Sequence, residues 1–349
     1  MQGIISGLRD FFPESSIDFV IPKSATSLIS HNPQVTTLYP LYTTSPHPSP
    51  DDLQSVISLI QKNNYDLVIN MSPFLSVKEI KKYSPMIGFL GFAFCMLRKR
   101  ALKEPVHLFS YTHTFIHTLL HTIYPSIPSS APPLPFVFLP KAAIDSASEF
   151  LKSHKKEPSP LIFFNREAAS PYTFIPESLQ FSLLEKLLKH PVSIIVPIRN
   201  KGSESFLEFI HTLPQDQQEK CIFLPIPTLL DTYAALIDMS DVVITGDTGP
   251  LHIAAARKLG TSSSYSFKNK TAIFSLFGAT DSYMYGYDSF RPSYTPAQQD
   301  APSRVYIGSR RYRTLAHINK NSIYGDPSLF FSDIDVDAIV SDIVSYLDI

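Results

Sequence analysis

The stretch TGDTGPLHIAAA, residues 245–256, decides the fold of the carboxyl-terminal half of the chain. It joins the β-branched run 241–245 to an alanine-rich segment, so it predicts a buried strand, a tight turn and a helix. Two of the chain's 12 glycines, Gly246 and Gly249, lie in the turn, and Pro250 suits the first helical turn. Unpaired amides at such a helix start favour an anion; a capped turn without a ligand is the alternative.

Three polar side chains in this stretch favour a ligand over the plain turn. Thr248 is placed to cap the helix or to donate its hydroxyl to a phosphate oxygen. A histidine in the first helical turn gains no capping benefit, so His252 indicates a contact with phosphate, and Asp247 is placed to orient it or to brace the loop. We therefore expect a nucleotide diphosphate at this turn.

The rest of this half alternates apolar runs of strand length with segments whose apolar residues recur three and four apart. This alternation predicts a doubly wound parallel sheet, in which ligands bind beyond the carboxyl ends of the strands. The expected strands are 160–165, 192–198, 220–226, 241–245 and 271–278, and the expected helices are 177–190, 204–213, 229–240, 250–260 and 333–347.

The amino-terminal half repeats the pattern less cleanly and predicts a second open α/β sheet. Its expected strands are 17–21, 36–42, 66–71 and 86–92, with helices at 50–64 and 113–124. A proline- and serine-rich stretch at 126–140 suits an extended hinge, because proline lacks an amide donor and fixes φ. We therefore expect one Rossmann-like domain over 1–140 and another over 141–349.

Composition and charge exclude several classes of protein. An apolar fraction of 44% with 17% charged residues describes a globular chain, and a formal net charge of -1 provides no general attraction to nucleic acid. Cys95 and Cys221 are too few for a disulfide framework or a cysteine-based zinc site. The longest apolar run, 86–97, is too short to span a bilayer, so we expect a cytoplasmic protein.

The signature 245–256, preceded by YAALIDMSDVVI (233–244) and followed by LFGATD (276–281), resembles that of the bacterial ADP-heptose lipopolysaccharide heptosyltransferases, glycosyltransferase family nine. Weaker similarity covers LRDFFPESSIDFVIP (8–22) and YDLVINM (65–71). The resemblance implies a GT-B fold of two facing Rossmann-like domains, with the acceptor on the first and the nucleotide-sugar donor on the second. It implies an ADP-heptose type of donor, a lipid-linked glycan acceptor and peripheral contact with the inner membrane.

The resemblance also implies roles for single residues. The donor diphosphate would meet Asp247, Thr248, Gly249 and His252, and Glu204 would hold the ribose. In the loop after strand 160–165 the family carries hydroxyls and then a lysine; this chain has no lysine there, and the hydroxyls would come from Ser170, Tyr172 and Thr173, with Arg166 as the charge. No cofactor and no metal are expected, and the catalytic residue is unassigned.

The family places its catalytic aspartate in a loop that follows an opening strand, whereas this chain opens with a helical pattern at 1–12. Neither Asp10 nor Asp18 matches that position, so we expect nucleotide binding with little transfer by the 349-residue chain. A noncatalytic nucleotide-binding protein and a sugar-nucleotide epimerase are the alternatives to a glycosyltransferase.

Two further segments carry open alternatives. His113, His117 and His121 recur four apart, which suits a partly buried polar stripe, contact with an anionic acceptor, or zinc. No carboxylate or cysteine is near them in the sequence, which argues against zinc. The segment 86–100, apolar and then basic, suits a buried strand that ends in solvated charges, or contact with an anionic membrane.

Overall fold

The computed structural model divides the chain into two compact units, Met1–Pro133 and Leu134–Ile349. The structure describes residues 2–41, 49–70, 87–89, 107, 113, 116–118, 120–121, 124–126, 137–168, 170, 172–199, 202–259, 271–280, 282–287, 301–309 and 327–349. Among these residues no helix has the length and apolarity that crossing a membrane requires. Each unit is described by itself.

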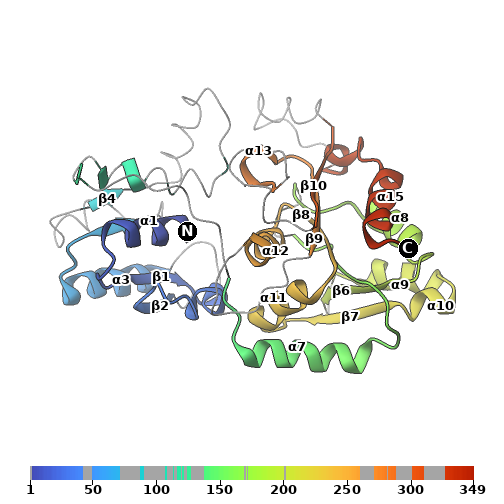
Figure 1. Cartoon of the computed structure of the whole chain (residues 1–349), viewed down its shortest axis with the longest axis horizontal. Helices are drawn as coiled ribbons and strands as arrows, with labels where there is room; N and C mark the ends of the chain where they lie inside the picture. Colours follow the sequence, from blue (N-terminus) through green and yellow to red (C-terminus); the bar gives the residue numbers. More distant parts are fainter. Residues whose placement is uncertain are drawn as a thin grey trace. The chain divides into compact units, whose positions relative to one another are not determined.

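The second unit is built on a six-stranded sheet with the order β10-β9-β8-β5-β6-β7, in which all neighbouring strands are parallel (Figure 1). Its strands are β5 (Leu161–Asn165), β6 (Ser193–Arg199), β7 (Cys221–Ile226), β8 (Val242–Gly246), β9 (Ala272–Phe277) and β10 (Ser303–Ile307). The central strands β5, β8 and β9 are buried along their whole length, which explains their unbroken apolar sequence. The doubly wound parallel sheet predicted from the sequence is therefore confirmed.

Helices cover both faces of this sheet (Figure 1). One face carries α7 (Lys141–His154), α11 (Leu230–Met239) and α12 (Gly249–Leu259), and the other carries α8 (Glu177–Leu187), α9 (Glu204–Thr212) and α15 (Val336–Leu347). The buried core joins the strands to α8, α9 and α15 through a continuous apolar cluster. The short α10 (Gln215–Gln218), α13 (Ser282–Tyr285) and η3 (Pro327–Phe331) complete the described part of this unit.

The strand order places a topological switch point between β5 and β8. From β5 the chain proceeds to β6 and β7 on one side of the sheet, and then crosses back to β8 on the other side of β5. In open α/β sheets the crevice outside the carboxyl ends of two such strands is where ligands bind. The turn that follows β8 therefore lies at the position that the fold favours for a ligand.

The first unit begins with α1 (Gln2–Phe11), as the opening helical pattern predicts. It contains two parallel strand pairs, β1 (Asp18–Pro22) with β2 (Thr37–Leu41) and β3 (Val68–Asn70) with β4 (Ile87–Phe89). The short η1 (Lys23–Ala25) and α2 (Ser27–Ser30) connect β1 to β2, and α3 (Pro50–Asn63) lies between the two pairs in the chain. The helix α3 starts with a capping box, in which the side chains of Ser49 and Asp52 each accept the other residue's backbone amide.

The sequence patterns missed some elements and left others untested. The helix α7 and the edge strand β10 were not predicted, because Lys141–His154 has many small residues and β10 is a short run that begins with the polar Ser303 and Arg304. Of the segment 86–100 only 87–89 are described, as a strand, and Cys95 and most of the hinge 126–140 lie outside the described residues.

Candidate functional site

The turn between β8 and α12 uses its two glycines for different reasons. A Cβ at Gly246 would lie 2.7 Å from the carbonyl oxygen of Thr173, so this glycine lets the 170–175 loop pack against the end of β8. A Cβ at Gly249 would meet no atom within 4 Å. The first residue of α12 therefore faces open space, where the helix amides are accessible to a ligand.

A buried network of hydrogen-bonded polar side chains fixes this turn. Asn165 at the end of β5 is the Cα partner of Thr245 on β8. The Asn165 amide donates to Thr245 Oγ1 and to Thr248 Oγ1, each at 3.1 Å, and its Oδ1 accepts from the Tyr233 hydroxyl at 3.1 Å. The Oγ1 atoms of Thr245 and Thr248 lie 3.0 Å apart. Three elements, β5, β8 and α11, thus fix the position of Thr248.

His252 is held by a tyrosine rather than by the aspartate that the sequence suggested. Its Nδ1 lies 2.9 Å from the Tyr287 hydroxyl, whereas its Nε2 lies 3.8 Å from Asp247 Oδ1, beyond hydrogen-bond distance. Burial lowers the pKa of His252 and raises the pKa of Tyr287. The imidazole is therefore neutral at pH 7. A Tyr287 hydroxyl that donates to Nδ1 leaves the single ring hydrogen on Nε2.

Asp247 closes this side of the turn. Its side chain is 10% exposed, and burial raises its pKa, an effect that the neighbouring Thr280 side chain partly offsets. Thr280 belongs to the LFGATD segment that follows β9, so the two halves of the sequence signature meet here. With Nδ1 engaged by Tyr287, the Nε2–H of His252 is the donor available to an anion at this turn.

The three hydroxyl residues predicted in the loop after β5, Ser170, Tyr172 and Thr173, differ in their contacts. Thr173 Oγ1 donates to the carbonyl of Ser170 at 3.2 Å, and the Ser170 hydroxyl accepts from the Tyr172 amide at 3.3 Å. Tyr172 is 41% exposed, with its ring edge-on to Phe330. Within the described residues these side chains stabilise the loop that packs on Gly246, and their contact with phosphate stays a prediction.

Arg166 is buried and does not provide an exposed charge. Its guanidinium donates to the Ser203 hydroxyl, lies 3.3 Å from Glu167 Oε1 and stacks over the Phe206 ring with 4.5 Å between the guanidinium carbon and the ring centroid. Glu167 also pairs with the exposed Arg199, Nε to Oε2, at 3.0 Å. Arg166 thus links the end of β5 to the start of α9, and burial lowers the pKa of its guanidinium.

Glu204 stands at the first position of α9, after the turn that follows β6. Its Oε2 accepts the backbone amide of Gly202 at 2.7 Å, and Gly202 has a φ of 84°, which favours glycine. One carboxylate oxygen therefore stabilises the turn. The predicted role of Glu204 toward a ribose remains a prediction.

The sequence did not identify three residues that build this site: Asn165, Tyr233 and Tyr287. Asn165 carried a usable signal, because it is the polar residue that ends the apolar run of β5. Tyr233 and Tyr287 look like ordinary core aromatics in the sequence, and their hydroxyl partners are decided by packing. Together these groups can bind an anion at the α12 start with helix amides, one hydroxyl and one neutral imidazole.

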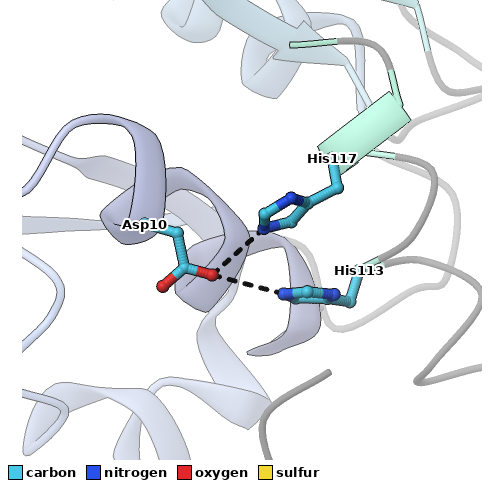
Figure 2. Close-up of side chains that lie close together, drawn as sticks. All are labelled: Asp10, His113 and His117. Atoms are coloured by element: carbon cyan, nitrogen blue, oxygen red, sulfur yellow. Dashed lines mark hydrogen bonds and ion pairs between the residues drawn. The ribbon is translucent and has the colours of Figure 1, made fainter. Parts of the chain in front are cut away.

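In the first unit, a carboxylate lies beside two of the histidines, although none is near them in the sequence. Asp10 on α1 places its Oδ2 3.1 Å from His117 Nε2 and 3.5 Å from His113 Nε2 (Figure 2). The two histidines are buried, while His121, one turn further along, is exposed. Asp10 escaped detection because 103 residues separate it from His113 in the sequence.

Comparisons with known proteins confirm the resemblance carried by the signature. Residues 138–265 match the model of the family described as glycosyltransferase family 9 (heptosyltransferase). Among curated proteins, lipopolysaccharide heptosyltransferase 3 of Escherichia coli (strain K12) is 33% identical over 72 residues. That alignment covers 20% of this chain and 21% of the relative, so the chain matches about a fifth of the relative's length.

Solved structures with the same fold cover nearly the whole chain. A glycosyl transferase family 9 structure from Veillonella parvula DSM 2008 has a TM-score of 0.71 at 19% identity, covering 99% of this chain and 92% of that one. The E. coli ADP-heptose lipopolysaccharide heptosyltransferase II has a TM-score of 0.64 at 18% identity, covering 99% and 93%. The predicted GT-B fold class is thereby confirmed.

Proposed function

We propose that this chain, whose residues 138–265 match glycosyltransferase family 9 (heptosyltransferase), transfers a sugar from a nucleoside diphosphate to a lipopolysaccharide-like acceptor. The donor class is that of ADP-heptose, since the name of the E. coli structure above gives this donor. The name of the curated relative, lipopolysaccharide heptosyltransferase, supports the acceptor class. Contact with the inner membrane surface, where a lipid-linked acceptor lies, is part of the proposal.

The observation that carries the proposal is the α12 start at the switch point of the second unit. Gly249 has open space around it, Thr248 is fixed by Asn165, and His252 is fixed by Tyr287. Such a helix start favours negative charge, because its first amides are unpaired and the helix dipole is positive there. A diphosphate is an anion that could accept hydrogen bonds from these amides, from the Thr248 hydroxyl and from His252.

In the proposed reaction the diphosphate is the leaving group, and negative charge builds up on it as the bond to the sugar breaks. The helix amides, the Thr248 hydroxyl and His252 Nε2–H would stabilise that charge without reorganising. Asp247 would hold the proton on Nε2 rather than contact the diphosphate, since two anions would repel each other. Glu204 would accept hydrogen bonds from the ribose hydroxyls, and the 166–176 loop would contribute Ser170, Tyr172 and Thr173.

A transfer assay tests the proposal directly. ADP-, UDP- and GDP-sugars are incubated with the chain and a lipid-linked glycan, and products are identified by mass spectrometry. His252→Gln is expected to lower the rate by on the order of 10²–10³, the cost of removing one donor to a developing oxyanion. His154→Gln is the matched control, because His154 is exposed on α7.

The outcomes separate the proposal from its alternatives. Nucleotide binding without transfer to any acceptor would indicate a noncatalytic binding protein, and conversion of the donor without acceptor would indicate an epimerase. Equal transfer rates for His252→Gln and the wild type would show that the α12 start takes no part in the reaction.

A further inference from the structure

We propose that Asp10, His113 and His117 form a binding site for a divalent transition metal, with zinc as the ion that suits them best. The site lies in the first unit, where α1 packs against the helical residues 116–118 (Figure 2). It does not depend on the proposed function, which rests on the second unit.

The distances from Asp10 to the two histidine nitrogens are close to the spacing that a zinc ion requires. Asp10 Oδ2 lies 3.1 Å from His117 Nε2 and 3.5 Å from His113 Nε2, and all three atoms lie within 4.8 Å of one another. With zinc–nitrogen and zinc–oxygen bonds of about 2.0–2.2 Å, adjacent ligand atoms of a tetrahedral site are separated by about 3.3–3.6 Å. An ion could therefore sit among the three atoms with only small side-chain shifts.

Both histidines, which are four residues apart in the sequence, present the same ring nitrogen, Nε2, to the carboxylate. Their ring centroids are 4.5 Å apart with an angle of 33° between the planes. The His117 ring also packs edge-on against Phe11, with 4.8 Å between centroids. These contacts hold the imidazoles in place before any ion binds, which reduces the entropy that ligation would cost.

Close helix approach brings Asp10 to the histidines. A Cβ at Gly7 would lie 3.2 Å from Ile116 Cγ2 and 3.6 Å from His113 Cδ2, so the lack of a side chain at Gly7 permits this contact. Asp10 follows Gly7 by three residues and lies on the same helix face. The apolar residues Ile4, Phe11, Ile116 and Leu120 pack as one cluster around this contact.

The donor set selects the class of ion. Two imidazoles and one carboxylate suit zinc and other late first-row metals, whereas calcium and magnesium prefer oxygen donors alone. The histidines are 1% and 6% exposed in their side chains, while Asp10 is 37% exposed. Solvent therefore reaches the carboxylate side, where a water molecule would complete the coordination of an ion with three protein ligands.

Zinc binding by the full chain tests the site. After treatment with a chelator, the protein is dialysed against zinc chloride, its metal content is measured by mass spectrometry, and its affinity for zinc alone by calorimetry. One zinc per chain is expected. Asp10→Asn and His117→Gln should each weaken binding on the order of a hundredfold, since even loss of an outer-shell partner costs 10–100-fold. His121→Gln is the matched control, because it changes an exposed histidine one turn away.

A second readout covers variants that fold poorly. Cobalt bound to the wild type should show the visible absorption typical of tetrahedral coordination, and His121→Gln should retain it. Absence of bound zinc in the wild type, or equal weakening by all three substitutions, would overturn the proposal and leave a histidine–aspartate hydrogen-bond cluster. Nucleotide binding by Asp10→Asn, measured in parallel, shows whether the second unit is intact.

Discussion

The two glycines of the β8–α12 turn offer a matched pair of substitutions. Replacing Gly249 by valine adds a side chain where a Cβ meets no atom within 4 Å, so the fold should tolerate it. Replacing Gly246 by alanine adds a Cβ 2.7 Å from the carbonyl oxygen of Thr173, where backbone must shift. The structure therefore predicts that one variant loses ligand binding and the other loses stability.

The magnitudes follow from the contacts at each position. The overpacking caused by Gly246→Ala should lower the free energy of unfolding by about 1–3 kcal/mol. In a unit of the size of the second one, this lowers Tm by roughly 2–12 °C. Gly249→Val should stay within about 0.5 kcal/mol of the wild type, as exposed substitutions do. If its side chain blocks two charge-assisted hydrogen bonds from helix amides, about 3–6 kcal/mol of binding free energy is lost. That corresponds to a Kd raised on the order of 10²–10⁴.

Calorimetry with ADP, UDP and GDP measures the affinity, and thermal unfolding of the same samples measures the stability. Gly249→Val should bind none of the nucleotides measurably while unfolding close to the wild-type Tm. Wild-type affinity in Gly249→Val would refute the assignment of the α12 start as the diphosphate site. A wild-type Tm for Gly246→Ala would refute the packing argument.

Two further predictions concern buried polar groups. Tyr233→Phe leaves Asn165 Oδ1 without the hydroxyl at 3.1 Å and should lower the unfolding free energy by about 1–3 kcal/mol, measured by denaturant titration, while Tyr172→Phe at an exposed ring should not. Burial lowers the pKa of Lys258 to about 7, whereas an unfolded lysine titrates at about 10.4. Between these two pH values the unfolded state binds a proton that the folded state lacks, so the free energy of unfolding should rise with pH. Lys258→Met should therefore show a smaller rise of the denaturant midpoint between pH 7 and 9.5 than the wild type. The exposed control Lys189→Met should keep the wild-type rise, and an equal rise in both variants would contradict the argument.

Much of the second unit is determined by local sequence. The runs that form β5, β8 and β9 are apolar without alternation because both faces of each strand are buried, and this pattern is visible before folding. The residues Thr248, Gly249 and Pro250 likewise predict a helix start, because their backbone preferences are local. In the first unit, Ser49 and Asp52 mark the start of α3 for the same reason.

Tertiary structure decided which side chains meet. The contact of Asn165 with Thr248 spans 83 residues, and that of His252 with Tyr287 spans 35. The sequence offered Asp247 as one candidate partner of His252, yet the tyrosine hydroxyl is the closer group. Asp10 and the two histidines likewise come together through packing, to which the missing side chain at Gly7 contributes room beside Ile116 and His113. Periodicity and turn chemistry act between neighbours along the chain, whereas these contacts depend on how whole elements pack, which no local pattern encodes.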